Sequence, residues 1–80
     1  MKTYRIAYLD EDGYEYDTEE CITKDEALEN AKTWVDSEEA PAAVVIETHN
    51  GVDSVCVDYF GDRKAILVFL EKFTLIELDE

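Results

Sequence analysis

Basic residues are scarce in this sequence. Only 7 of its 80 residues are Lys or Arg, against 21 Asp and Glu, so the formal net charge at pH 7 is -14. Such a charge disfavours direct binding to nucleic acid or to an anionic membrane, because both are themselves negative. It is compatible with a basic protein partner, with cations, or with a role limited to keeping the protein soluble.

Cysteines and long apolar stretches are also rare. Cys21 and Cys56 are too few for a disulfide framework, so we expect both to be reduced, with a disulfide between them as the alternative. No apolar run approaches the roughly 20 residues required to cross a bilayer, and the chain starts with no apolar signal segment. The sequence therefore predicts a cytoplasmic protein that does not associate with membranes.

Residues suited to catalysis or metal binding are few. The single histidine, His49, is not placed beside a Ser or Cys by any nucleophile motif, and Cys56 is the one soft ligand expected near it. The acidic turn that begins at Asp10 has its glycine at the fourth position, whereas a calcium loop requires it at the sixth. We therefore expect no catalytic residues, no metal, no cofactor and no enzymatic activity.

The residues that are present are those of one small folded domain covering positions 1–80. The hydrophobic fraction is 46%, and there are nine aromatic residues (five Tyr, three Phe and one Trp). A chain of this length has room for a single core, since it buries only roughly 60 to 65% of the surface that it exposes when unfolded. Its high charge is therefore not a sign of disorder.

The clearest element is an amphipathic helix over about residues 24–37. Its start is predicted by a capping box, in which Thr23 is followed three residues later by Glu26. Its apolar side chains recur at the 3.6-residue period of a helix, and they are Ala27, Leu28, Ala31, Trp34 and Val35. This stripe predicts one face packed on a sheet, with Trp34 at the centre of the contact.

Strand patterns lie on both sides of this helix. Two hairpins are expected, one turning at Asp12-Gly13 and one at Asn50-Gly51, a dipeptide typical of type I′ turns. Their strands are residues 2–9 with 14–22, and 42–49 with 52–60. Pairing outward from Asn50-Gly51 places Val44, Ile46, Val55 and Val57 on one side of the sheet. We expect the helix to pack on that side.

The last quarter of the chain is ambiguous. Residues 65–70 form an apolar run of six, which suits a buried strand, and residues 73–78 are expected to form a final strand. A helix over residues 62–72 is the alternative, and it would give a ferredoxin-like βαββαβ order. The predicted fold is α+β, with an antiparallel sheet of about five to six short strands and one helix on one face.

The acidic residues are concentrated in one segment. Residues 10–39 contain 13 Asp and Glu and only two Lys, a net -11 of the total -14. If residues 14–22 form a regular strand, Glu15, Asp17 and Glu19 lie about 6.6 to 6.8 Å apart on one face. Successive phosphates of a nucleic-acid strand have a comparable spacing, so this row predicts mimicry of a nucleic acid. The alternative is a solvated acidic face.

Tyrosines are interleaved with these carboxylates, and tyrosine is enriched at the centres of protein interfaces. The pattern favours a partner-binding surface over an ordinary polar face. The candidate contacts are Asp10, Asp12, Tyr14, Glu15, Tyr16, Asp17, Glu19, Asp25 and Glu29.

The chain resembles, in type, the small acidic inhibitor proteins of phages and mobile elements, such as anti-CRISPR and anti-restriction proteins. The features that carry this resemblance are the short length, the acidic ribbon at residues 10–20, and a hairpin followed by the helix, Pro41 and a valine-rich hairpin. The resemblance implies a non-enzymatic inhibitor that binds a basic nucleic-acid-binding surface on another protein. The alternative is a small adaptor or homodimerising module that pairs through a sheet edge or apolar face. The oligomeric state stays open.

Overall fold

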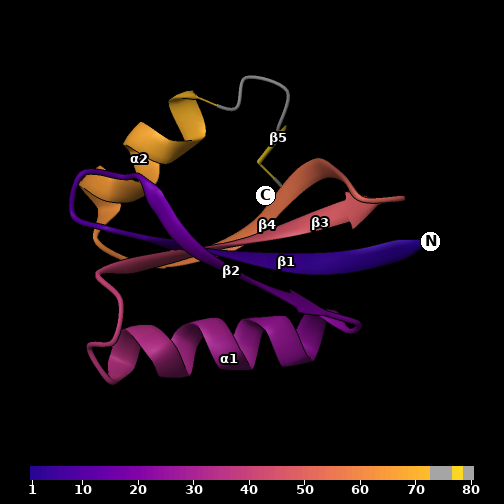
Figure 1. Cartoon of the computed structure of the whole chain (residues 1–80), viewed down its shortest axis with the longest axis horizontal. Coiled ribbons are helices and arrows are strands. Elements are labelled where there is room, and N and C mark those ends of the chain that lie inside the picture. Colours follow the sequence, from indigo (N-terminus) through magenta and orange to yellow (C-terminus); the bar gives the residue numbers. More distant parts are fainter. Residues whose placement is uncertain (73–76, 79–80) are drawn as a thin grey trace.

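The computed structural model describes residues 1–72 and 77–78, which form one mixed sheet between two helices. The elements are β1 (Lys2–Leu9), β2 (Glu15–Cys21), α1 (Lys24–Asp36), β3 (Ala42–His49), β4 (Val52–Gly61), α2 (Arg63–Glu71) and β5 (Glu77–Leu78). Helix α1 lies on one face of the sheet and α2 on the other (Figure 1).

The strand order is β2-β1-β3-β4-β5, in which β1 to β4 pair antiparallel. The short β5 pairs parallel with β4. The predicted α+β class is therefore correct, but the predicted architecture of five to six antiparallel strands and one helix is wrong. The second helix of the alternative is present, yet its βαββαβ order is not, because two strands precede α1.

Helix α2 occupies the segment for which a strand was predicted. Asp62 caps it by accepting a hydrogen bond from the Lys64 amide, 2.9 Å away. Ala65, Ile66 and Phe69 form its buried stripe, whereas Leu67 is 52% exposed. The spacing of these three residues is helical, and a run of six apolar residues fits a helix as well as a strand. Of the predicted final strand over residues 73–78, positions 73–76 lie outside the described residues.

Helix α1 forms where the sequence predicted it. The Thr23 hydroxyl accepts a hydrogen bond from the Glu26 amide at 3.2 Å, which satisfies one free donor of the first turn. Its buried face consists of small residues, Ala27 and Ala31, so the helix approaches the sheet closely. Trp34 is not at the centre of this contact but at its edge, with 43% of its surface exposed.

The sheet face that α1 covers is not the predicted one. Ala43 and Val45 of β3 pack in the α1 cluster, while Val44 and Ile46 pack in the α2 cluster. Two irregularities in the β3–β4 pairing also shift its register, so that Ile46 lies opposite Cys56 and not Val55. The central strands are apolar on both sides, and the sequence pattern therefore did not distinguish the two faces.

Candidate functional site

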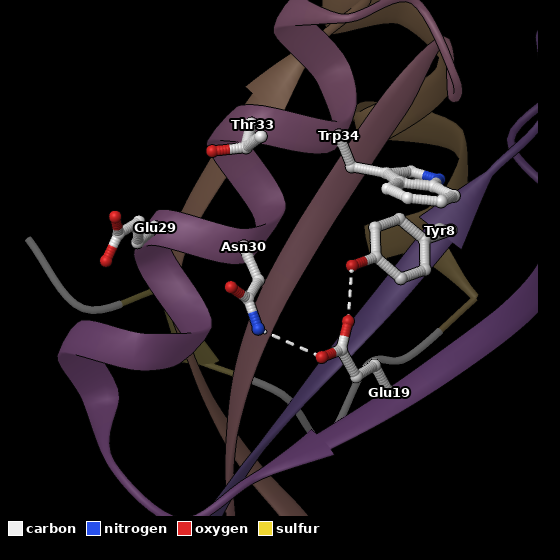
Figure 2. A pocket seen from close by; sticks show the side chains of 6 residues that line it. All are labelled: Tyr8, Glu19, Glu29, Asn30, Thr33 and Trp34. Carbon is white, nitrogen blue, oxygen red and sulfur yellow. Dashed lines mark hydrogen bonds between the residues drawn. The ribbon is translucent and has the colours of Figure 1, made fainter.

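A pocket of about 430 Å³ opens between α1 and the β1–β2 hairpin. Figure 2 shows the side chains that line it, which come from one side of α1 and from the inner surface of the hairpin. The lining residues are Tyr8, Glu19, Glu29, Asn30, Thr33 and Trp34. Two of the six are acidic and none is basic, so the pocket is negatively charged.

The Glu19 carboxylate is held at the inner wall of this pocket. Glu19 lies opposite Ile6 in the β1–β2 ladder, and this register directs its side chain toward α1. One carboxylate oxygen accepts a hydrogen bond from the Tyr8 hydroxyl at 2.8 Å, and the other accepts one from the Asn30 amide at 2.9 Å. These two donors fix the orientation of the carboxylate. The Cys21 thiol is a further donor, 4.0 Å from the oxygen that accepts from Asn30, so a lone pair remains on the oxygen that accepts from Tyr8.

Tyr8 and Trp34 form the aromatic wall of the pocket. Their ring centroids are 5.8 Å apart and the rings are tilted by 51°. Tyr8 is buried, at 4% exposure, and it supports the more exposed Trp34. Burial, and next the hydrogen bond to Glu19, raise the pKa of Tyr8, so its hydroxyl remains a donor at neutral pH.

Glu29 and Thr33 form the outer rim. In Figure 2 their side chains point away from Tyr8 and Glu19, on the other side of Asn30. Glu29 is exposed, so its carboxylate faces solvent at the mouth of the pocket.

The predicted row of Glu15, Asp17 and Glu19 on one strand face is not present. Tyr8 pairs with Asp17 but Leu9 pairs with Glu15, so Tyr16 is an extra residue in a β-bulge. A bulge of one residue reverses the alternation of side chains. Asp17 and Glu19 therefore face α1, whereas Glu15 faces α2.

On the α2 side, Glu15 is engaged within the protein. Arg5 forms ion pairs with Glu15 and with Asp53, the latter at 2.8 Å, and the Arg5 side chain is only 16% exposed. Burial lowers the pKa of Arg5, but the hydrogen bond to Asp53 and the charge of Glu15 outweigh this effect, and the net shift is upward. Glu15 is thus a structural partner of Arg5 in this arrangement.

The predicted contacts in the β1–β2 turn also lie on the α2 side. The Asp10 carboxylate accepts hydrogen bonds from the amides of Asp12 and Tyr14, both at 2.9 Å, and so stabilises the turn. A Cβ on Gly13 would lie 2.7 Å from the Ala65 carbonyl oxygen, which shows how closely the turn packs on α2. The Lys72 ammonium lies 3.5 Å from the centroid of the Tyr14 ring.

The remaining predicted contacts lie on the α1 side. The Tyr16 hydroxyl donates to the Glu39 carbonyl oxygen at 3.2 Å, beyond the end of α1. Asp17 is exposed on β2, and Asp25 is exposed in the first turn of α1. The structure therefore brings Asp17, Glu19 and Glu29 to one side of the molecule and separates them from the acids of the turn.

Sequence reasoning missed the roles of Asn30, Thr33 and Trp34 in the pocket. The apolar stripe of the helix predicts a core position for Trp34, because it falls at the helical period. No local pattern indicates that Asn30 reaches Glu19, since that contact joins residues from different elements. The pairing of Tyr8 with Glu19 likewise depends on the strand register, which the sequence pattern does not reveal.

The cysteines lie on opposite faces of the sheet, Cys21 in the α1 cluster and Cys56 in the α2 cluster. Both are free, and this separation rules out the alternative of a disulfide between them. Burial is the first cause that raises the pKa of each thiol, to about 11. Both are therefore weak nucleophiles at neutral pH.

Metal ligands do not gather in the structure. Within residues 1–72 and 77–78, no group of three or more His, Cys, Asp and Glu side chains is arranged to hold a metal ion. The His49 ring instead lies 3.0 Å from a Glu47 carboxylate oxygen, and Lys2 also pairs with Glu47 at 3.3 Å.

No protein-family model, curated protein or solved structure matches the chain. Among the described residues, no helix is long and apolar enough to span a membrane.

Proposed function

We propose that this protein is a non-enzymatic inhibitor that docks its α1 side on a basic, nucleic-acid-binding surface of a cytoplasmic protein. The observation that carries the proposal is the uneven distribution of charge. Helix α1 and the two acids of β2 that face it, Asp17 and Glu19, together carry six acidic and two basic residues, whereas residues 63–72, which include α2, carry one acidic and three basic residues. The two helices lie on opposite faces, so the helix on one face has a net negative charge and the helix on the other a net positive charge.

The form of mimicry that fits this arrangement is a broad acidic patch and not a single row. Asp17 and Glu19 of β2 face α1, which itself presents Asp25 and Glu29. Two elements thus contribute carboxylates to one side. Basic groups that contact this patch would displace the counterions of its carboxylates, as they displace those of the phosphates on nucleic acid, so binding should weaken steeply with salt.

The test compares two triple variants with the same charge change. Asp17→Lys, Asp25→Lys and Glu29→Lys alter the α1 side, and Glu11→Lys, Asp12→Lys and Glu71→Lys alter the turn and α2. Each triple changes the net charge from -14 to -8. The tagged proteins are used to capture partners from a lysate of the source organism or of its host. Captured proteins are eluted by a salt gradient and by competing DNA or RNA.

We expect the wild type and the α2-side triple to retain a nucleic-acid-binding partner that DNA or RNA displaces. The amount of partner that the α1-side triple captures should be at least about tenfold lower than for the wild type, because the new lysines repel the basic surface that the carboxylates attract. An equal loss of captured partner in both triples would show that only the net charge of the protein determines binding. Full retention by the α1-side triple would contradict the proposal.

The competing function, an adaptor or homodimer, is favoured by the edge position of β2 in the sheet. However, both sheet faces are covered by helices, and a second β2 placed along this edge would bring like charges together. We therefore expect a monomer in sedimentation velocity at low salt. A dimer that persists at all salt concentrations would favour the homodimer instead.

A further inference from the structure

We propose that the pocket between α1 and the β1–β2 hairpin binds the guanidinium group of an arginine side chain on the docking partner. This inference rests on the proposed function, because it identifies the group that the α1 side recognises.

The inner part of the pocket presents oriented hydrogen-bond acceptors. Glu19 is fixed by Tyr8 and Asn30, and the oxygen that accepts from Tyr8 keeps a lone pair for a further donor. Because the Asn30 nitrogen donates to Glu19, its side-chain oxygen points away from Glu19, as Figure 2 shows. The pocket is therefore lined by acceptor oxygens from a strand and from a helix, with the Asn30 oxygen on the side away from Glu19.

The aromatic wall adds a second kind of contact for a cation. The Trp34 indole is 43% exposed, and it packs against the buried Tyr8 ring. An indole face is the best of the aromatic surfaces for a cation. Figure 2 shows the Tyr8 ring between Trp34 and Glu19, and all three residues line the pocket, so a cation bound there would lie beside the indole and within the field of the carboxylate.

These features favour arginine over lysine. A guanidinium is planar, presents five N–H donors and stacks on aromatic rings, so it can contact several acceptors and Trp34 at once. An ammonium is a more strongly hydrated point charge with three donors. The pocket lining supplies no basic residue of its own, and the two carboxylates in the lining would attract one from a partner.

The first test uses N-acetyl-arginine methylamide as the probe. Trp34 is the single tryptophan, so its fluorescence reports on the pocket alone. We expect a saturable change in Trp34 emission, together with NMR shifts of the Asn30 side-chain amide. The matched citrulline compound has nearly the same shape without the charge, and it should cause no saturable change. The lysine compound should bind about threefold more weakly or worse.

The second test uses variants of the pocket, with binding followed by NMR because one variant lacks the fluorophore. Trp34→Leu should weaken binding of the arginine probe about fivefold, and Glu29→Gln about threefold. Glu71→Gln on α2 removes the same charge far from the pocket and should leave the affinity unchanged.

Equal binding of citrulline, or wild-type affinity in Trp34→Leu, would overturn the proposal. NMR shifts spread evenly over all exposed carboxylates would also overturn it, since they would indicate unspecific ion binding. If the α1-side lysine triple loses its partner but the arginine probe does not bind the pocket, docking stands and the pocket inference fails. If the probe binds while that triple keeps its partner, the pocket is a cation site and the docking proposal fails.

Discussion

At the scale of single residues, Arg5 links three strands on the α2 side of the sheet. It lies on β1 and pairs with Glu15 on β2 and Asp53 on β4. Two of its nitrogens contact the Asp53 carboxylate, at 2.8 and 3.2 Å, a bidentate geometry that Lys could not reproduce. In a protein with so few basic residues, one guanidinium thus pairs with two carboxylates, and the group of three keeps a net charge of -1.

We expect Arg5→Met to lower the free energy of unfolding by about 2 kcal/mol, because it leaves two part-buried carboxylates without their partner. Urea unfolding followed by circular dichroism measures this change. Lys24→Met is the control, since it also makes the net charge -15 but removes an exposed lysine at the start of α1. That variant should differ from the wild type by less than about 0.5 kcal/mol. Similar losses in both would mean that overall charge, and not the ion pairs, determines stability.

The two buried thiols are expected to lower the free energy of unfolding at alkaline pH. The folded state raises the pKa of Cys21 and Cys56 from 9.0 to about 11, first of all by burial. The contribution of the two thiols to the free energy of unfolding is therefore fully present below pH 9. It is lost as the pH rises toward 11, because the thiols of the unfolded chain lose their protons at a lower pH than those of the folded protein. We expect each thiol to contribute a loss of about 1 kcal/mol by about pH 10. Urea titrations at about pH 8, 9 and 10 test this.

The Cys56→Ala variant is the control for the alkaline titration. It should show a shallower decline over the same pH range than the wild type, whatever its stability at the lowest pH. A decline of identical slope in both proteins would argue against a contribution from this thiol.

At the scale of elements, the local signals of the sequence were sufficient where a few neighbouring residues determine the structure. Thr23 caps α1, and Asn50-Gly51 forms the β3–β4 turn with positive φ at both residues. These local patterns did not predict the structure where contacts with residues distant in the sequence determine it. The six apolar residues at positions 65–70 suit either element type, and Asp62, which caps α2, is equally typical of a turn.

The candidate site was predictable in part for the same reason. The acidic character of β2 and α1 is a property of composition and could be recognised directly. The bulge at Tyr16 could not, because an extra residue in a strand has no reliable local pattern. It alone decides that Glu15 faces Arg5 while Asp17 and Glu19 face α1.

The β4–α2 junction depends on a glycine. Gly61 has φ +96°, and a Cβ there would lie 2.3 Å from the Pro41 carbonyl oxygen. We expect Gly61→Ala to destabilise the protein by more than about 3 kcal/mol, through both the contact and the backbone conformation. Gly51→Ala is the control, because Gly51 has φ +82° but a Cβ there would meet no atom within 4 Å, and it should cost about 1 kcal/mol. Equal stability of the two variants in urea unfolding would contradict this interpretation.

At the scale of the whole molecule, the repulsion within the net charge of -14 extends over much of the protein at low salt. The radius of gyration is 11.2 Å, and at about 0.02 M salt the screening length is about 20 Å. Each acidic residue is therefore repelled by acidic residues well beyond its immediate neighbours under these conditions. At about 0.5 M salt the screening length falls to about 4 Å, and only neighbouring charges interact.

We expect the melting temperature to rise between about 0.02 and 0.5 M salt, because screening relieves this repulsion. Differential scanning calorimetry measures the rise. The α1-side lysine triple, with a net charge of -8, should show a smaller rise than the wild type. A melting temperature that stays flat over this range would indicate that repulsion does not limit stability.

The bulge at Tyr16 also affects how this chain can vary. Deleting that one residue would make β2 regular, with Glu15 next to Asp17 and still opposite Leu9. Because neighbouring strand residues alternate, Glu15 would stay with Arg5 on the α2 side, and Asp17 and Glu19 would stay on the α1 side. A single-codon deletion would thus keep both the internal ion pair and the acidic patch, and among the contacts of β2 it would remove the hydrogen bond from Tyr16 to the Glu39 carbonyl oxygen.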